Sequence, residues 1–289
     1  MPSTNPLRPD AASALAAWEA LVRANVEQME RLREAVLASG EDFWTGRTAA
    51  FRPGLRESPE LAAIEALARP EDTWLDIGAG GGRFAVPLST HVARVVAIEP
   101  SSAMRETLIE AARQPDAGSI EVVDLRWPPA ADDTTVPVAD VAFAANVLYD
   151  IADLGVFLDA MERHARRACI ALVTDRAPST PHPDVWLALY GEPLCALPAL
   201  PELLAVLGAL GRRVDVQTFP VRPSTPMTPE QAVDEMRWRY WVTPGSERAA
   251  RLSALLVEHF GTADGMVVLP PRFNYLAVAS WPSTAGASA

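Results

Sequence analysis

The middle of the chain alternates between short apolar runs and segments with helical periodicity. Five runs rich in valine, isoleucine and alanine predict strands, at residues 73–78, 94–99, 120–125, 138–147 and 169–174. Helical spacing separates them, at residues 83–91, 101–114 and 154–167. Continuously apolar strands joined by helices are typical of a parallel sheet that is buried on both faces. We therefore expect an α/β fold with an open, doubly wound, mostly parallel sheet, which binds ligands beyond the carboxyl ends of its strands.

Helical sequence flanks this alternation on both sides. Before it, an apolar stripe runs along residues 11–39, through Leu15, Trp18, Val22, Met29, Leu32 and Val36. The stripe has two interpretations, packing on its own domain or pairing with a second copy in a homodimer. After it, helices are expected at residues 184–190, 200–211, 229–241 and 246–260, and strands at 214–221 and 272–281.

These patterns divide the chain into four parts. We expect residues 1–70 to form an N-terminal helical cover and residues 71–175 to form the cofactor-binding core. Residues 176–281 are predicted to supply a helical lid and the last strands, and residues 282–289 a frayed tail. The late strands complete a seven-stranded, Rossmann-like sheet.

Composition and charge narrow the functional classes. The chain has 289 residues, 49% of them apolar, so it can bury a large core. Its net charge of −12 repels nucleic acid and anionic membranes, and no run reaches the ~20 apolar residues of a membrane span. None of the 25 basic residues is a lysine, which excludes a Walker-A phosphate clamp and lysine-dependent catalysis. Two cysteines, Cys169 and Cys195, suggest neither a disulfide framework nor a zinc site, so we expect a cytoplasmic protein without a metal.

A glycine-rich turn directly follows the first predicted strand, in the run DIGAGGGR at residues 76–83. Glycines let a backbone approach a ligand closely, and the start of a following helix presents free N–H groups. A dinucleotide fingerprint would require a third glycine where Arg83 stands. The spacing that fits is acid-x-Gly-x-Gly-x-Gly, formed by Asp76, Gly78, Gly80 and Gly82.

This spacing resembles the first motif of the class I S-adenosylmethionine-dependent methyltransferases, and the resemblance covers residues 73–175. It implies that S-adenosylmethionine is the cofactor. It also implies that Gly78, Ala79 and Gly80 wrap the methionine part of this cofactor, with Asp76 orienting it.

The next two strand ends carry further residues that the resemblance assigns to the cofactor. Glu99 ends the second strand about 20 residues beyond the loop, where a carboxylate can accept both ribose hydroxyls, and Pro100 follows it. Met104 would lie beside the adenine. At the end of the third strand, Asp124 would accept the adenine amino group and Leu125 would offer its backbone N–H.

The fourth strand closes with Asn146, Val147, Leu148, Tyr149 and Asp150. Family members place residues here that contact both the cofactor and the reacting atom, which assigns Asn146 to the cofactor site. Enzymes that methylate nucleobase or glutamine amines carry Asn-Pro-Pro-Tyr or a near variant at this position, and this chain lacks the prolines. The difference, together with the negative charge, favours the small-molecule branch of the family.

An acceptor hydroxyl or ammonium group would need a base to remove its proton. Candidates near the strand ends are Tyr149, Asp150, His182 and Glu192. Tyr149 has a second interpretation as a pocket wall, and His182 has one as a loop residue.

Two segments rich in arginine and aromatic residues are predicted to cover the site. Residues 43–47 resemble a segment that precedes the sheet in small-molecule methyltransferases, which implies that Trp44 covers the cofactor and Arg47 pairs with its carboxylate. Residues 237–241 are predicted to form a lid whose arginines could pair with a carboxylate on the acceptor. Arg272 could reach the same mouth from the start of the last strand.

The sequence therefore predicts an enzyme that moves a methyl group from S-adenosylmethionine to an O, N or C nucleophile of a small molecule by in-line displacement, leaving S-adenosylhomocysteine. Two alternatives stay open. The first is a non-catalytic S-adenosylmethionine-binding regulatory or scaffold homologue. The second is a nicotinamide-dependent oxidoreductase, which Arg83 opposes.

Overall fold

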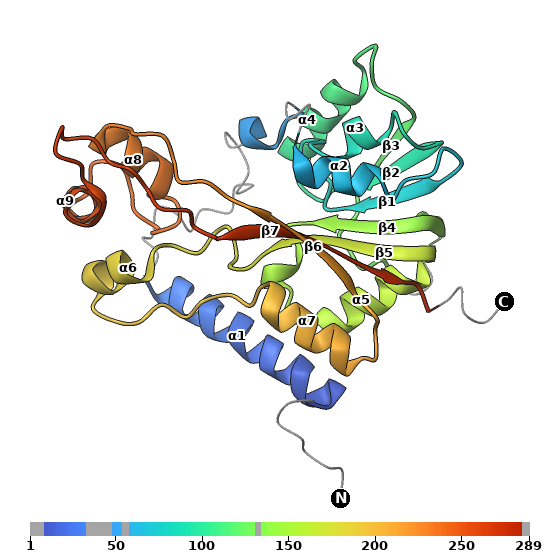
Figure 1. The fold of residues 1–289 in the computed structure, drawn as a ribbon, viewed down its shortest axis with the longest axis horizontal. Coiled ribbons are helices and arrows are strands. Elements are labelled where there is room, and N and C mark those ends of the chain that lie inside the picture. Colours follow the sequence, from blue (N-terminus) through green and yellow to red (C-terminus); the bar gives the residue numbers. More distant parts are fainter. Residues whose placement is uncertain (1–8, 33–47, 54–57, 131–133, 285–289) are drawn as a thin grey trace, which may run out of the picture.

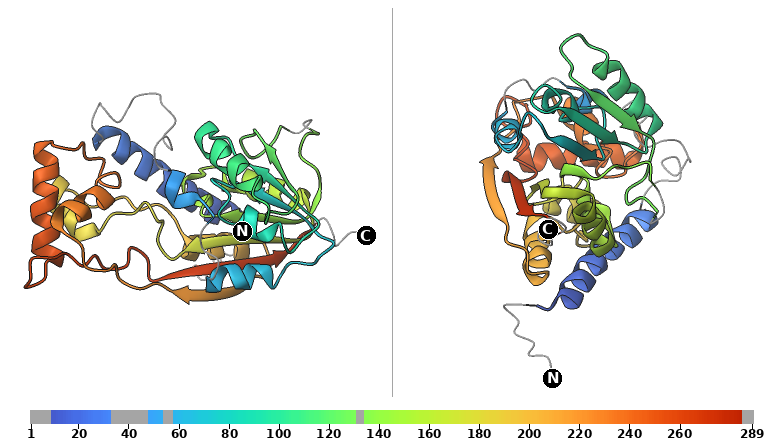
Figure 2. Two further views of the ribbon diagram at one scale, coloured as in Figure 1. Left: turned by 90° about the horizontal axis from the view of Figure 1, so that it is seen from above. Right: turned by 90° about the vertical axis from the view of Figure 1, so that its right-hand side faces the viewer.

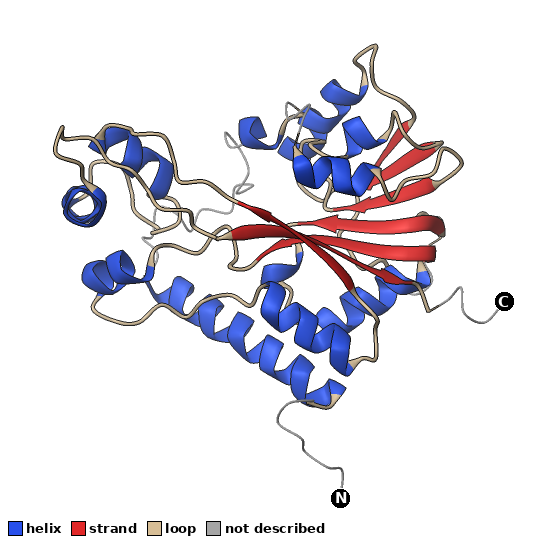
Figure 3. Ribbon diagram, viewed as in Figure 1, coloured by secondary structure: helices blue, strands red, loops and turns tan. Residues whose placement is uncertain are grey.

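The sheet has seven strands in the order β3-β2-β1-β4-β5-β7-β6 (Figures 1 and 3). The computed structural model describes residues 9–32, 48–53, 58–130 and 134–284. The strands are β1 (Thr73–Ile77), β2 (Arg94–Ile98), β3 (Ile120–Val123), β4 (Ala139–Ala145), β5 (Ala165–Thr174), β6 (Asp215–Pro220) and β7 (Tyr275–Pro282). Strands β1 to β5 pair in parallel, whereas β7 runs antiparallel to both β5 and β6. The predicted seven-stranded, mostly parallel sheet is confirmed.

Helices lie on both faces of the sheet (Figure 1). They are α1 (Ala11–Leu32), α2 (Pro59–Glu65), α3 (Ala85–Leu88), α4 (Ser102–Ala112), α5 (Leu154–Arg163), α6 (Pro183–Tyr190), α7 (Leu200–Ala209), α8 (Pro229–Met236) and α9 (Glu247–Phe260). Two short 3-10 turns, η2 (Thr48–Phe51) and η3 (Leu148–Asp150), complete the described elements. One face carries α1, α5 and α7, and the other carries α2, α3 and α4.

Three helices end or begin away from their predicted positions. Residues 83–91 contain only the four helical residues of α3, because the glycine turn extends into this segment. Helix α5 ends at Arg163, and the next residues enter β5, where Ala165 pairs with Ala139. Helix α8 ends at Met236, since the chain turns sharply enough to place Trp241 at a positive φ of 49°. Tertiary contacts set these helix ends, and local sequence periodicity does not predict such contacts.

The apolar stripe of α1 is used within the chain. Trp18 and Val22 are buried in the core beneath the sheet, and the indole N–H of Trp18 donates to the carbonyl of Ile151 at 2.8 Å. Burial of a tryptophan of this kind contributes about 3–5 kcal/mol to stability. Of the two interpretations, the structure therefore shows packing on the chain's own core, and a homodimer stays a prediction.

A buried carboxylate joins the far ends of three elements. Glu162, near the end of α5, accepts two hydrogen bonds from Arg212, at 2.6 and 2.8 Å. The same carboxylate accepts from the indole of Trp281 in β7 at 3.0 Å and from the hydroxyl of Thr284 at 2.8 Å. A buried charge needs such partners, so this network holds α5, the α7–β6 turn and the end of β7 in register.

Helices α6, α8 and α9 form a separate apolar cluster, which we call the distal cluster. It lies beyond the carboxyl ends of the parallel strands (Figures 1 and 2). Its centre contains Trp186, Met236, Tyr240 and Leu252, each fully or almost fully buried. Within the described residues, no helix is long and apolar enough to cross a membrane.

The C-terminal half of α1 connects the sheet to the distal cluster. Gln28 donates to the carbonyl of Pro193 at 2.8 Å and accepts from the backbone N–H of Cys195 at 2.7 Å. Met29 and Leu32 pack against the distal cluster. One helix therefore takes part in two apolar cores.

Candidate active site

The glycine turn after β1 is held against the ends of two neighbouring strands. The backbone N–H groups of Gly78 and Ala79 both donate to the carbonyl of Ile98, at 2.8 and 3.0 Å. Gly78 has a positive φ of 73°, and a Cβ there would lie 2.6 Å from a methyl carbon of Val147. Gly80 also has a positive φ, of 56°, in a position with more open space. The turn therefore needs glycine for its conformation and leaves its backbone accessible.

Glu99 links this turn to the end of β2. Its side chain is only 6% exposed, and its two oxygens accept from the backbone N–H groups of Gly80 and Ser101, each at 2.8 Å. A carboxylate is an acceptor-only group, and a diol of a ligand is a suitable donor to it.

Asp76 carries an unsatisfied buried oxygen. The residue is 2% exposed, and its Oδ2 has no hydrogen-bond partner among the described residues. Burial, reinforced by the nearby charge of Glu99, raises the pKa of Asp76 to about 7. An orphaned carboxylate oxygen is costly unless a donor or cation reaches it. The residues present therefore fit a ligand that carries an ammonium group and a ribose diol, as S-adenosylmethionine does.

The ends of β4 and β5 are joined through one tyrosine. The hydroxyl of Tyr149 donates to Asn146 Oδ1 at 3.0 Å and accepts from the backbone N–H of Thr174 at 2.8 Å. Burial raises the pKa of Tyr149 to about 12, so its hydroxyl stays protonated at neutral pH. Asn146 has a positive φ of 57°, an uncommon conformation that asparagine tolerates better than most residues. This bonding disfavours Tyr149 as a base and makes it a cross-link at the sheet edge.

The other two predicted bases differ in environment. Asp150 is exposed at the end of η3, although surrounding protein atoms still desolvate its carboxyl enough to raise its pKa, which Arg126 opposes. His182 precedes α6, and its Nε2 is buried without a hydrogen-bond partner from any residue that the structure describes. Burial first, and then the charges of Arg272 and Arg176, lower the pKa of His182 to about 4. The imidazole is therefore neutral at physiological pH.

The remaining predicted residues lie as follows. Met104 is buried in the first turn of α4, and Pro100 is exposed. Asp124 is largely exposed and forms an ion pair with Arg105 at 2.7 Å, while Leu125 packs against the core. Trp44 and Arg47 lie outside the described residues.

The fourth candidate base, Glu192, is engaged elsewhere. Its carboxylate accepts from Arg31 and Gln28 of α1, and the hydrogen bond from Arg31 lowers its pKa. A base at this position would have to give up its bonds to α1.

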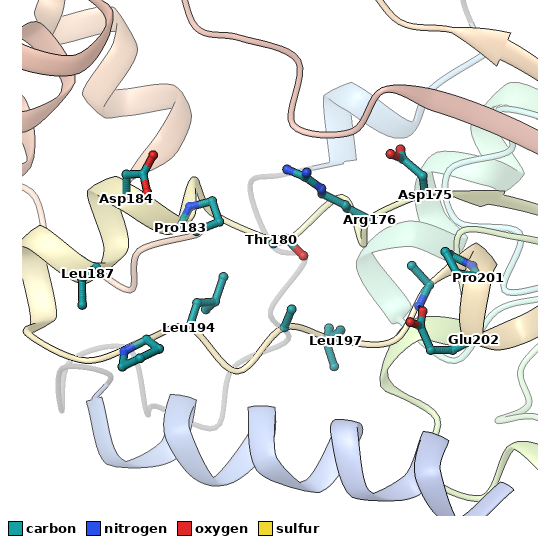
Figure 4. A pocket seen from close by; sticks show the side chains of 13 residues that line it. Asp175, Arg176, Thr180, Pro183, Asp184, Leu187, Leu194, Leu197, Pro201 and Glu202 are labelled. Atoms are coloured by element: carbon teal, nitrogen blue, oxygen red, sulfur yellow. The ribbon is translucent and has the colours of Figure 1, made fainter. Parts of the chain in front are cut away.

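A cleft of about 440 Å³ opens at the carboxyl end of β5 (Figure 4). Residues 175–187 contribute one wall and residues 193–202 the other. The lining side chains include Arg176, Thr180, Leu187, Leu194, Leu197 and Glu202. Sequence reasoning missed this cleft and the role of Thr174, although the strand end at residues 174–175 marks the place.

Comparison with known proteins agrees with this geometry. Residues 75–173 match a family model described as a methyltransferase domain. No curated relative matches the sequence.

Solved structures share the fold. YcgJ from Bacillus subtilis is 15% identical, with a TM-score of 0.52 over 77% of this chain and 97% of its own. A methyltransferase from Thiobacillus denitrificans, solved in complex with S-adenosylhomocysteine, is 17% identical, with a TM-score of 0.50 over 83% of this chain and 96% of its own. The matched domain, the strand order and the glycine turn with its two buried acids lead to one conclusion: residues 75–173 form a methyltransferase domain, and the chain has the fold of S-adenosylmethionine-dependent methyltransferases.

Proposed function

We propose that this enzyme methylates an O, N or C nucleophile of a small molecule. The observation that carries the cofactor part is the unsatisfied Oδ2 of Asp76, buried next to the Glu99 carboxylate and the glycine turn. S-adenosylmethionine, when bound, supplies an already activated methyl group on a sulfonium.

The residues of this chain hold the cofactor and orient it. Asp76 accepts from the ammonium group of the methionine part, and the backbone of Gly78, Ala79 and Gly80 lies against that part. Glu99 accepts hydrogen bonds from the ribose hydroxyls.

Two further groups of residues complete the cofactor site in this proposal. Met104 and Pro100 border the adenine and the ribose, and Asp124 and Leu125 bind the edge of the adenine. Asn146 lies at the end of β4, where cofactor and acceptor meet.

The cleft beside β5 supports a small molecule as the acceptor. Its volume of about 440 Å³ lies within the usual range for small-ligand sites, ~300–1,000 Å³. The net charge of −12 and the absence of the Asn-Pro-Pro-Tyr pattern disfavour a nucleic-acid acceptor. The proposal includes a cytoplasmic location.

Deprotonation of the acceptor falls to Asp150 or His182. Asp150 is accessible and carries a raised pKa, so it can accept a proton and release it to water. His182 is neutral and has a free ring nitrogen. Tyr149 fixes the positions of Asn146 and Thr174. Alignment and exclusion of water account for most of the catalysis, because the donor is already activated.

Calorimetric titration tests the proposal directly. We expect the wild-type chain to bind S-adenosylmethionine and S-adenosylhomocysteine but not NADH. Glu99→Gln should weaken both sulfur ligands by at least roughly tenfold, because a charge-assisted pair of bonds to a diol contributes more than about 1.4 kcal/mol. Glu110→Gln, at an exposed glutamate of α4, is the matched control and should bind normally.

Each alternative has its own outcome. Binding of NADH alone would establish the oxidoreductase. Binding of the sulfur ligands with no methyl transfer to any member of a broad acceptor panel would establish the non-catalytic homologue.

A further inference from the structure

Two arginines from distant parts of the chain converge on one carbonyl oxygen at the edge of the sheet. The carbonyl of Pro178 accepts from Arg239 Nε at 3.2 Å and from Arg272 Nη1 at 3.1 Å. Pro178 belongs to the loop after β5, Arg239 follows α8, and Arg272 precedes β7. We call this group, Arg239 and Arg272 around the Pro178 carbonyl, the arginine seam.

Neither guanidinium of the seam has an ionic partner in the part of the chain that the structure describes. Arg239 is only 8% exposed, and its other contacts are the carbonyl of Glu235 at 2.7 Å, the sulfur of Met236 and the ring of Trp238. Burial lowers the pKa of Arg272, and the charge of Glu235 opposes that shift. Among the described residues, no carboxylate oxygen lies within 4 Å of either guanidinium. One buried and one half-buried positive charge therefore lie together without a paired anion from the described residues.

The seam also retains unused hydrogen-bond donors. Arg239 Nη2 and Arg272 Nη2 form no hydrogen bond to any described residue. His182, in the same loop, adds a buried Nε2 without a partner. A guanidinium presents its N–H groups as a planar fork that matches a carboxylate. Burial without a counter-ion and with free donors is the arrangement that binds an anion.

The seam shares the loop after β5 with the cleft that we propose for the acceptor. The hydroxyl of Thr174 donates to the carbonyl of Arg176, two residues before Pro178, and Thr174 also bonds Tyr149. Arg176 lines the cleft at the end of β5 (Figure 4). Thr180 lines it as well, so the loop residue whose carbonyl holds both arginines, Pro178, stands between two residues of the cleft wall.

We propose that Arg239 and Arg272 bind a carboxylate group of the methyl acceptor and thereby select acidic acceptors. This inference rests on the proposed function for the identity of the ligand as an acceptor. The surrounding carboxylates are Asp175, which is bonded to Asn274 and Tyr275, and the exposed Asp184 and Glu235. These acids balance much of the local positive charge, so the seam favours a monoanion over a dianionic phosphate.

Binding of simple probes tests the seam without knowledge of the acceptor. Benzoate, benzamide and inorganic phosphate are titrated calorimetrically into the full-length protein. We expect benzoate to bind at least roughly tenfold more tightly than benzamide or phosphate, because only benzoate combines a planar monoanion with an apolar body. Equal binding of benzoate and benzamide would overturn the proposal, and tighter binding of phosphate would overturn the assignment to a carboxylate.

Three variants assign the binding to the seam. Arg272→Gln and Arg239→Gln should each weaken benzoate by roughly tenfold or more. Arg272→Lys, which keeps the charge but loses the fork, should fall between Arg272→Gln and wild type. Arg251→Gln is the matched control, because this exposed arginine of α9 also donates to one backbone carbonyl, that of Ala188. Equal loss in Arg251→Gln would reveal a general charge effect and overturn the proposal.

Two readouts keep the outcomes separate. If Arg239→Gln does not fold, as judged by its thermal transition, the half-buried Arg272 carries the test alone. S-adenosylhomocysteine is titrated into the same preparations and should bind all of these variants as it binds wild type. Normal binding of this ligand without preferential binding of benzoate overturns the seam only, whereas its absence in wild type overturns the proposed function.

Discussion

Asp76 should destabilise the ligand-free protein at neutral and alkaline pH. Its folded pKa of about 7 lies above the ordinary value of 3.8, so the folded state binds the proton more tightly than the unfolded chain does. The stability that this proton contributes is complete below pH 3.8 and is lost as the pH rises through about 7. Asp76→Asn removes the titration and should therefore be more stable than wild type near pH 8.

The size of the effect follows from the pKa difference. A shift of about 3 units at about 1.36 kcal/mol each gives about 4 kcal/mol as the largest change in the stability difference between low and high pH. About two of these units lie above pH 5, so urea unfolding of both proteins near pH 5 and pH 8 should show about 2.7 kcal/mol of this change. Asp159→Asn, at a side chain 65% exposed on α5, controls for the loss of one negative charge. A stability difference between Asp76→Asn and wild type that does not change with pH would refute the reasoning.

The same substitution should weaken ligand binding although it stabilises the free protein. If Asp76 Oδ2 accepts from the ammonium group of the cofactor, Asp76→Asn should bind S-adenosylhomocysteine at least roughly tenfold more weakly while the free protein becomes more stable. Calorimetry near pH 8 tests this. Unchanged affinity in a stabilised variant would separate the buried charge from ligand binding and contradict the proposed role.

Three further predictions concern the turn, a buried ion pair and the sheet edge. Gly78→Ala should lower the free energy of unfolding by about 1–3 kcal/mol and abolish binding of S-adenosylhomocysteine, because a Cβ would lie 2.6 Å from a methyl carbon of Val147. Normal binding would show that the turn tolerates the Cβ. Glu162→Gln should lower the free energy of unfolding in urea by about 3–5 kcal/mol, since it leaves the guanidinium of Arg212 unpaired. A loss no larger than that at an exposed glutamate would show that this ion pair behaves as a solvent-exposed one. Tyr149→Phe should lower the free energy of unfolding by about 1–3 kcal/mol, because it removes the bond to Thr174. It should leave the pH dependence of kcat unchanged, because the pKa of about 12 keeps this hydroxyl protonated. Loss of a basic limb in the pH profile would instead identify a base.

Much of the fold could be predicted because the patterns that specify it are local. Each parallel strand is buried on both faces and is therefore a continuous apolar run, as in Arg94–Ile98 and Ala139–Ala145. The turn was predictable for a similar reason. Gly78 and Gly80 have the positive φ angles that their spacing suggests, and Glu99 directly follows β2.

The rest depends on contacts between residues far apart in the sequence. The bond from Thr174 to Tyr149 spans 25 residues, and the bond from Arg272 to Pro178 spans 94. Some predicted helix ends were wrong for the same reason. Helix α8, for example, ends at Met236, because tertiary contacts bend the chain there although the periodic pattern continues. No local pattern shows that two arginines share one carbonyl, or that one carboxylate oxygen is left without a donor.

Helix α1 is a rigid connection between the core beneath the sheet and the distal cluster. Its first turns are embedded beneath the sheet through Trp18, and its last turns are bonded to the segment at Pro193 and Cys195 and packed against the distal cluster. A continuous helix of 22 residues resists bending, so the distal cluster cannot swing on a hinge without pulling tryptophan out of the core. Entry of a ligand into the cleft therefore depends on movement of loops and side chains. A break near the middle of α1 would loosen the distal cluster while the sheet stays intact.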